Sequence, residues 1–335
     1  MRTKIKRRVL VKLGNNCNQS CAYCHASKNK EYIFNEDIIT FLQQENIDKI
    51  GFGGGEPLMY FERIKQIITT IDNRAIDYKF TSNGFLLTED IVRFLNEHAV
   101  AVHLSFDGLN TGRQYPGNDA LTLYSKLEHK AISTVVFNDN INLDKLSTEA
   151  HEFALRSGMP IFHMLPSFIH QTTVNEENLS RADRNTAKAY IKYYNALMEG
   201  YIYMFLAGQY TFIRGIMLKI GERYNDNLYT KGCMCCNENN MMLTASGDFL
   251  LCPYGNNIVG DIYKGIDWDY VERFVPKRCQ ACELRNKCGC SCVTNVTDNE
   301  CYIYKNTYDH FLKICDKYHV TPQELKARIK EVYLE

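Results

Sequence analysis

Residues 8–24 carry the sequence RVLVKLGNNCNQSCAYC. The apolar, β-branched run at 8–13 predicts a strand, and Cys17, Cys21 and Cys24 follow it within a short polar loop. Thiolates at this spacing can bind three irons of one cuboidal iron–sulfur cluster and leave its fourth iron without a protein ligand. An open metal position is typical of catalysis, and a zinc site or incidental thiols are the alternatives. The stretch therefore favours a catalytic cluster at the end of the first strand.

Strand-like runs and helical segments alternate through the first half of the chain. Apolar runs rich in β-branched or aromatic residues lie at 8–13, 48–53, 76–82, 100–106, 131–137 and 159–165. Segments of helical periodicity lie between them, at roughly 36–46, 60–71, 88–97, 119–128 and 144–157. The alternation predicts a parallel α/β fold, and its units are too few for the eight of a closed barrel. We therefore expect an open partial barrel, followed by a helical segment at 181–221.

The composition argues against several classes of protein. The 335 residues include 39 Lys+Arg and 39 Asp+Glu, which is not the charge balance of a general nucleic-acid binder or a polybasic membrane protein. No run approaches the ~18 consecutive apolar residues of a membrane span. Residues 1–8 are basic but lack the apolar core of a secretion signal. We expect a cytoplasmic protein, protected from oxygen, with no nucleic-acid or membrane partner.

Cysteine is the unusual residue, with 14 in the chain. None falls between residues 25 and 232, and the remaining cysteines crowd the last third. A chain of this length folds without disulfide staples, so local clusters of cysteine favour metal sites over a disulfide framework.

The late cysteines follow a second pattern. Cys236 and Cys252 flank a segment, MMLTASGDFLLC at 241–252, that predicts a β-hairpin turning at 246–248. Such a hairpin would bring the cysteines at its two ends together. Five more follow as Cys279, Cys282, Cys288, Cys292 and Cys301. Because CxxC pairs also bind zinc, a structural zinc module is the alternative to iron–sulfur clusters here.

The CxxxCxxC motif, with the aromatic Tyr23 before its last cysteine, resembles the signature of radical S-adenosylmethionine (radical SAM) enzymes. Three more stretches at successive strand ends resemble family motifs: Gly54-Gly55-Glu56-Pro57, Thr81-Ser82-Asn83-Gly84 and Ser105-Phe106-Asp107-Gly108. The resemblance implies that Cys17, Cys21 and Cys24 bind a 4Fe–4S cluster that chelates SAM. It implies SAM contacts from Tyr23, Gly54, Gly55, Glu56, Pro57, Ser82, Asn83, Ser105 and Asp107. Glycines let a backbone approach a ligand, and a carboxylate or carbonyl suits the ammonium group of SAM.

Seven of the eight cysteines from Cys236 to Cys301, all except Cys290, resemble the pattern of the SPASM domain, which carries auxiliary clusters behind some radical SAM barrels. Two four-thiolate clusters need eight ligands, and Cys233 and Cys235 are the candidates for the eighth. The resemblance implies a first auxiliary cluster on Cys233 (or Cys235), Cys236, Cys252 and Cys292. It implies a second on Cys279, Cys282, Cys288 and Cys301, so that the protein would bind SAM and three 4Fe–4S clusters. Cys290 and Cys315 remain, as packing thiols or a substrate-side sulfur.

Together these resemblances imply an α/β protein with a partial (β/α)6 radical SAM barrel and a small cysteine-rich SPASM domain containing a β-hairpin. The expected division is a barrel at 1–170, a helical connector at 171–227, the SPASM domain at 228–302 and C-terminal helices at 303–335.

The implied activity is reductive cleavage of SAM to a 5′-deoxyadenosyl radical that abstracts hydrogen from a peptide or protein. The products considered are a thioether or carbon–carbon cross-link, an epimerised residue, or the formylglycine of a sulfatase. A non-catalytic electron-transfer protein is the alternative from another class. Reduced flavodoxin or ferredoxin is the expected electron donor. Only sixteen residues precede Cys17, so a leader-peptide-binding partner would be a separate protein, or the enzyme would grip its peptide directly.

Overall fold

The structure is a computed structural model. It describes residues 7–21, 23–24, 31–73, 75–159, 164, 167–168, 182–211, 213–224, 236–237, 239–252, 257–284, 288 and 297–334. None of the helices in these ranges is both long and apolar enough to cross a membrane.

One open, mostly parallel sheet organises the chain, in the order β11-β10-β9-β8-β1-β2-β3-β4-β5. Its parallel strands are β1 (Arg7–Gly14), β2 (Ile47–Gly54), β3 (Asp77–Ser82), β4 (Ala101–Ser105), β5 (Lys130–Ser133) and β8 (Asn240–Thr244). Antiparallel strands extend the β8 side: β9 (Asp248–Leu250), β10 (Ile258–Asp261) and β11 (Gly265–Ile266). A separate parallel pair is formed by β6 (Val135–Val136) and β7 (Ser167–Phe168).

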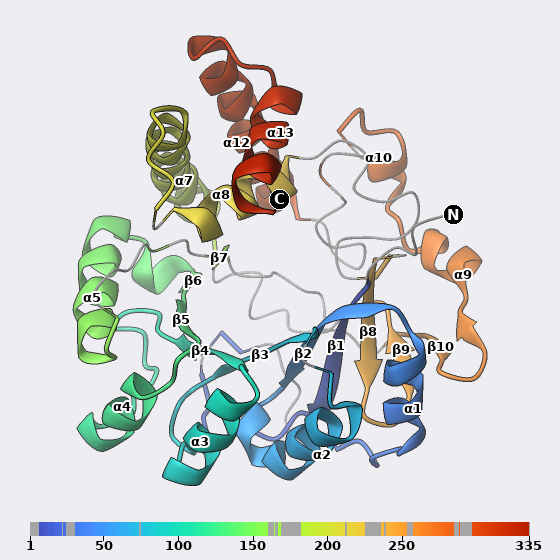
Figure 1. Ribbon diagram of the computed structural model, residues 1–335. Helices are drawn as coiled ribbons and strands as arrows, with labels where there is room; N and C mark the ends of the chain where they lie inside the picture. Colours follow the sequence, from blue (N-terminus) through green and yellow to red (C-terminus); the bar gives the residue numbers. More distant parts are fainter. Residues whose placement is uncertain are drawn as a thin grey trace.

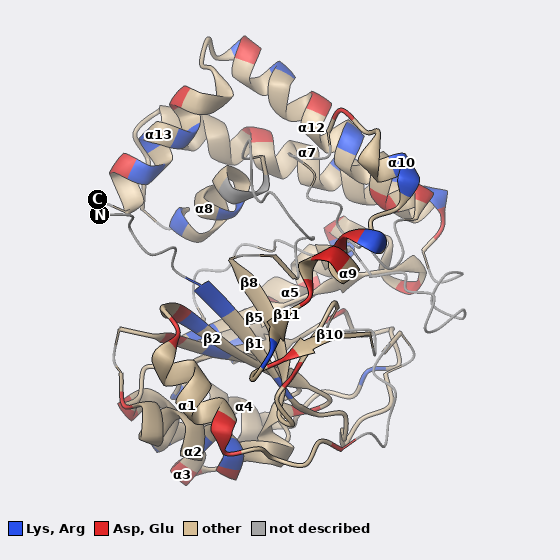
Figure 2. Ribbon diagram, turned by 90° about the vertical axis from the view of Figure 1, so that its right-hand side faces the viewer, with Lys and Arg blue, Asp and Glu red and all other residues tan. Residues whose placement is uncertain are grey.

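Helices cover the sheet on both sides. The outer side carries α1 (Asp37–Gln44), α2 (Phe61–Ile71), α3 (Glu89–Glu97), α4 (Asn118–Ser125) and α5 (Leu143–Arg156), with 3-10 turns at Pro57–Tyr60 and Asn138–Asn140 (Figure 1). The later helices are α7 (Arg184–Leu206), α8 (Arg214–Arg223), α9 (Trp268–Arg273), α10 (Lys277–Gln280), α12 (Asp298–Lys317) and α13 (Pro322–Tyr333). Figure 2 shows α7, α8, α12 and α13 as a layer that the sheet separates from α1, α2 and α3.

Strand alternation places the core between the sheet and the outer helices. Val9, Val11 and Leu13 of β1 are buried on one face of the strand, where Ile64 and Ile67 of α2 belong to the same apolar cluster. Because successive side chains of a strand point to opposite faces, the intervening residues face the inner side of the arc. The apolar core therefore lies between the sheet and the outer helices. The inner face of the sheet does not take part in that core.

The predicted strand–helix alternation is confirmed from β1 to α5. The sheet is open and does not close into a barrel, which confirms the prediction from the number of strand–helix units. The sixth expected strand, at 159–165, falls mostly outside the described residues, and β7 begins at Ser167 and pairs with β6 instead of β5.

The predicted hairpin is also present, as β8 and β9, with Gly247 at φ +94° in its turn. Sequence reasoning placed it in a separate small domain, whereas β8 pairs in parallel with β1 and continues the barrel sheet. The expected boundary at residue 302 lies within α12, which begins at Asp298 because Thr297 and Glu300 form a capping box there. The division into domains itself stays a prediction.

Candidate active site

The loop that follows β1 is tied to the ends of the neighbouring strands. The N–H of Glu56, after β2, donates to the carbonyl of Asn16 (2.9 Å). Asn83, after β3, donates from Nδ2 to Oδ1 of Asn18 (2.6 Å). Further on, the Gln19 amide donates to the carbonyl of Gln114 (2.9 Å), in the segment after β4. Parallel strands present their carboxyl ends at one edge, and these bonds hold the cysteine loop there against the residues that follow β2, β3 and β4.

Three glycines allow the loop to lie against the strand ends. A Cβ on Gly14 would lie 2.2 Å from Oη of Tyr60, and one on Gly54 would lie 1.9 Å from the carbonyl oxygen of Gly14. A Cβ on Gly55 would lie 2.1 Å from the carbonyl oxygen of Asn16. In the structure Gly54 and Gly55 make room for the backbone that leads to Cys17, and their predicted contact with SAM stays a prediction.

Replacing Gly55 by Ala should lower the free energy of unfolding by about 1–3 kcal/mol, because backbone atoms must move to admit the methyl group. Gly200→Ala is the control, since Gly200 lies inside α7 with open space around its Cβ position. That change should raise stability by up to ~1 kcal/mol, as alanine is the better helix former. Denaturant unfolding of both variants under anoxic conditions measures the difference. Equal stability of the two would contradict the close approach.

Glu56 joins two of the strand ends from a buried position. Its carboxylate accepts from Oγ of Ser82 (2.7 Å), from the N–H of Asn83 (2.8 Å) and from the N–H of Leu58 (3.2 Å). Burial raises the pKa of Glu56, and the donors from Asn83, Ser82 and Leu58 lower it. The sequence interpretation offered this carboxylate to an ammonium group. In the structure it connects the turns after β2 and β3, and a contact of Glu56 with SAM stays a prediction.

A buried cluster of Tyr23, Asp107 and Arg113 connects the cysteine loop to the end of β4. Asp107 is 1% exposed and accepts from Oη of Tyr23 and from Nε of Arg113 (2.7 Å). Arg113 also donates to Oη of Tyr23 (2.5 Å). A third donor to Asp107 is the N–H of Val135 (2.7 Å), which links β4 to β6. Ser105, the other motif residue here, is the last residue of β4 and pairs with Ser133 of β5.

The charges in this cluster support each other. Burial raises the pKa of Asp107, while the Arg113 guanidinium and the Tyr23, Val135 and Arg113 donors lower it. Burial lowers the pKa of Arg113, but the Asp107 carboxylate outweighs it and raises that pKa above its usual value. Arg113 was missed by sequence reasoning. The signal was weak, since one basic residue in the segment after the Ser105–Gly108 motif has no spacing that marks it.

The three cysteines of the loop are partly exposed and lie within electrostatic range of one another. The N–H of Cys24 donates to the carbonyl of Cys21 (3.0 Å). Burial raises the pKa of Cys21, the Arg113 guanidinium lowers it, and Cys24 and Cys17 raise it further. Within the described residues, no three Cys, His, Asp or Glu side chains gather closely enough to hold one metal ion. Ligands of a cuboidal cluster each bind a different iron, and the three partly exposed thiols of this loop are the donor set that such a cluster takes.

Three of the four cysteines predicted to bind the second auxiliary cluster also lie near one another. Cys279 lies in α10, the N–H of Cys282 donates to its carbonyl (3.2 Å), and Cys301 lies in the first turn of α12. Burial raises the pKa of Cys301, Arg278 lowers it, and Cys279 and Cys282 raise it, which places the three thiols in one neighbourhood.

The remaining cysteines are only partly described. Cys236 and Cys252 are buried, and Cys288 is half-buried. Burial within α12 raises the pKa of Cys315 to about 11, as expected for a packing thiol. Cys233, Cys235, Cys290 and Cys292 lie outside the described residues.

Comparisons with known proteins agree with this geometry. Residues 11–134 match the Radical SAM superfamily. The radical SAM cyclopropyl synthase TigE of Paramaledivibacter caminithermalis is 30% identical over 32% of this chain and 29% of its own length. The chain matches less than half the length of the first curated relatives.

Two solved structures share the fold. Native anSMEcpe with bound AdoMet and Kp18Cys peptide is 16% identical, with a TM-score of 0.63 over 94% of this chain and 99% of that one. Streptococcus suis SuiB bound to the precursor peptide SuiA is 15% identical, with a TM-score of 0.58 over 86% and 72%. The likeness of this chain to the Radical SAM superfamily thus covers residues 11–134, and members of that superfamily are enzymes that bind SAM and a 4Fe–4S cluster.

Proposed function

We propose that this protein is a radical SAM enzyme that modifies a peptide or protein, with a cross-link in a ribosomally made peptide as the favoured product. The observation that carries the proposal is the cysteine loop, which is bonded to the ends of β2 and β3 and to the segment after β4. Two structures of this fold hold peptides, Kp18Cys in one and SuiA in the other, which supports a peptide as the partner.

The chain's own residues would orient the cofactors. Cys17, Cys21 and Cys24 would hold the first cluster, and Asn83 would fix the loop through Asn18 while its Nδ2 lies 3.9 Å from Sγ of Cys17. When bound, SAM and the reduced cluster supply a 5′-deoxyadenosyl radical that abstracts a hydrogen atom from the substrate.

Tyr23 would shield that site from water. It is 7% exposed, and its ring packs against Phe137 with centroids 4.7 Å apart. Exclusion of water protects a reactive intermediate from side reactions.

Two auxiliary clusters complete the proposal. Cys279, Cys282, Cys288 and Cys301 would hold one of them, and the shared neighbourhood of Cys279, Cys282 and Cys301 supports this set. Cys236, Cys252, Cys292 and Cys233 (or Cys235) would hold the other. They would sit on the substrate side, where they can accept an electron from the substrate or bind it.

Cys301→Ala should remove roughly four irons and abolish the peptide product. The variant should still cleave SAM, but without modifying a substrate. The reason is that Cys301 belongs to α12 and is not one of the three loop cysteines that would hold the SAM-binding cluster. Cys315→Ala, a change of a buried thiol in the same helix, should keep the full iron content. Iron analysis and Mössbauer spectra measure the cluster content of both variants. An unchanged iron count in Cys301→Ala would contradict Cys301 as a cluster ligand.

The experiment for the proposed function supplies reduced flavodoxin, SAM and a pool of candidate peptides to the anoxic enzyme, in normal water and in D2O. Mass spectrometry detects a cross-link as the loss of two hydrogens, and an epimerised residue as uptake of deuterium. Formylglycine would appear as oxidation of a Cys or Ser residue. If SAM is cleaved and no peptide changes mass or takes up deuterium, the peptide proposal is wrong.

A further inference from the structure

The side-chain amide of Asn83 is held in one orientation at the end of β3. Its Oδ1 accepts from the N–H of Phe85 (3.1 Å). A backbone N–H can only donate, so the atom that faces Phe85 is the oxygen, and Nδ2 points the other way. The backbone of Asn83 is fixed as well, because its N–H donates to the carboxylate of Glu56 (2.8 Å). Asn83 and Glu56 are both buried, so the fold sets the direction of this amide.

The nitrogen of that amide faces the cysteine loop. Nδ2 of Asn83 donates to Oδ1 of Asn18 (2.6 Å) and to Sγ of Cys17 (3.9 Å). An amide nitrogen carries two hydrogens, so it can serve both partners. A second donor to the same sulfur is the N–H of Gln19 (3.4 Å). Sγ of Cys17 therefore accepts one hydrogen bond from its own loop and one from the end of β3.

These donors gain importance when Cys17 is a cluster ligand, because a ligand cysteine is a thiolate. A thiolate carries a negative charge, so the hydrogen bonds that it accepts are charge-assisted. Reduction of an iron–sulfur cluster increases the negative charge that its ligand sulfurs share, and a donor to such a sulfur stabilises the reduced state more than the oxidised state. Hydrogen bonds to the sulfurs are accordingly among the features that set the potential of a cluster.

We propose that Asn83 raises the reduction potential of the first cluster by donating an N–H···S hydrogen bond to the Cys17 thiolate. The inference rests on the proposed function, since it concerns the cluster that this function requires. In the step that it affects, reduced flavodoxin or ferredoxin loses one electron and the cluster gains it, and no bond is formed or broken. Asn83 acts through Cys17 and is a positioning residue, which makes this electron transfer more favourable.

The test is a redox titration of the anoxic holoenzyme, followed by EPR in the absence of SAM. The signal of the first cluster is the one that the Cys17/Cys21/Cys24 triple Ala variant lacks. At the wild-type midpoint, the ratio of reduced to oxidised cluster should be roughly threefold to tenfold lower in Asn83→Ala. A tenfold change equals ~59 mV for one electron, so the midpoint should fall by about 30–60 mV. Because SAM is left out, a lost contact with SAM cannot cause the shift.

Asn83→Asp removes the donor without changing the size of the side chain. A carboxylate keeps an oxygen for the N–H of Phe85, but it has no hydrogen to donate to Sγ of Cys17. It also places a negative charge near that sulfur, which disfavours the reduced cluster. The midpoint should therefore fall further in Asn83→Asp than in Asn83→Ala.

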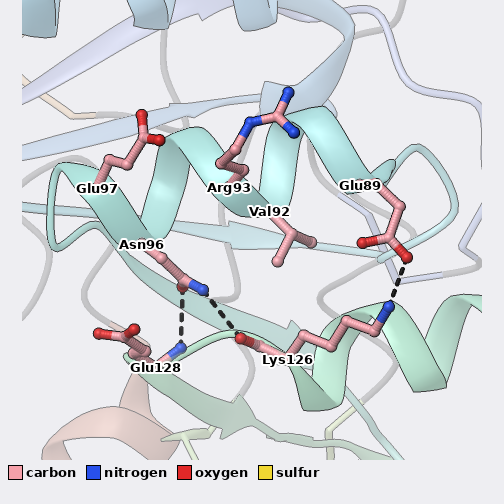
Figure 3. Close-up of a pocket in the computed structure, with 7 residues that line it drawn as sticks. All are labelled: Glu89, Val92, Arg93, Asn96, Glu97, Lys126 and Glu128. Atoms are coloured by element: carbon pink, nitrogen blue, oxygen red, sulfur yellow. Dashed lines mark hydrogen bonds and ion pairs between the residues drawn. The ribbon is translucent and has the colours of Figure 1, made fainter.

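Asn96→Ala is the matched control. Asn96 lines a pocket at α3, where its Nδ2 donates to the carbonyl of Lys126 (2.9 Å) and its Oδ1 accepts from the N–H of Glu128 (3.0 Å) (Figure 3). Like Asn83, it is an asparagine whose amide bonds to the backbone of a neighbouring segment. Its loss removes hydrogen bonds of the same kind at a place without cysteines, so the midpoint should stay unchanged.

Asn18→Ala separates the bond to sulfur from the bond that holds the loop. It removes the other partner of the Asn83 amide and leaves Nδ2 of Asn83 free to donate to Cys17. Oδ1 of Asn18 lies 4.0 Å from Sγ of Cys17, and removing this negative end of a dipole favours the reduced cluster. The midpoint should therefore stay the same or rise, opposite in sign to the effect of Asn83→Ala.

Three results would overturn the inference. An Asn83→Ala variant with the wild-type midpoint would show that the amide does not affect the potential. A fall in Asn18→Ala as large as that in Asn83→Ala would show that the effect comes from the position of the loop. Loss of the first cluster from both Asn83 variants would assign the amide to holding the loop alone.

The proposed function fails on different observations. A reduced wild-type protein that shows the signal of the first cluster but leaves SAM intact would refute the proposed function alone. A wild-type protein without that signal would refute the proposed function and the inference together. A shifted midpoint in Asn83→Ala beside normal SAM cleavage by the wild type would support both.

Discussion

Arg113→Met should lower the free energy of unfolding by about 3–5 kcal/mol, because it leaves a buried carboxylate without its cation. The side chains of Arg113 and Asp107 are 11% and 1% exposed, so water cannot replace the guanidinium. The substitution also removes the donor that holds Oη of Tyr23, and with it one of the ties between the cysteine loop and β4. Denaturant unfolding of the anoxically purified variant measures the loss.

A surface pair provides the control. Arg93 pairs with Asp90 on α3 with both side chains mostly exposed, so Arg93→Met should change stability by less than ~1 kcal/mol. A double variant with Arg113→Met and Asp107→Asn should be less destabilised than the sum of the two single variants, because neither charge is then left alone. Additive losses would show that Arg113 and Asp107 do not act as a pair.

Changing Cys17, Cys21 and Cys24 together to Ala should abolish SAM cleavage and remove roughly four irons, leaving about eight in the auxiliary pair. The loop has no other cysteines, so no protein ligand for the first cluster would remain. The auxiliary cysteines lie far along the chain, and their irons should stay bound. Iron content and the release of 5′-deoxyadenosine are measured on the same preparation.

Measuring the stability of the triple variant shows whether a loss of activity comes from the missing cluster or from unfolding of the protein. The three side chains are only partly buried, so truncation to Ala removes little apolar packing. A variant that unfolds like the wild type and still cleaves SAM would show that this loop does not hold the catalytic cluster.

The elements that could be predicted from the sequence are those that depend on local patterns of residues. Apolar runs predicted β1 to β4, and the cysteine motif and the short motifs were predicted at the ends of successive strands, where they lie. Those signals are strong because a parallel sheet aligns the carboxyl ends of its strands whatever their exact lengths.

The features that were missed depend on long-range contacts. Pairing of β8 with β1 joins residues more than two hundred positions apart, and a hairpin pattern does not say which sheet edge it will join. Arg113 and the role of Glu56 became visible only in three dimensions, since each depends on partners from other strand ends. The glycines were recognised, and the structure adds a reason for them in the neighbouring backbone at 14–16, while their contact with a ligand stays a prediction.

The most direct test of the central claim is the release of 5′-deoxyadenosine from SAM by the anoxically purified, dithionite-reduced protein. We predict a brown protein with roughly twelve irons per chain that releases 5′-deoxyadenosine, and no release from the Cys17/Cys21/Cys24 triple variant. A colourless protein that holds zinc, or an iron-loaded and reduced protein that leaves SAM intact, would contradict the assignment of residues 17–24 as the catalytic loop.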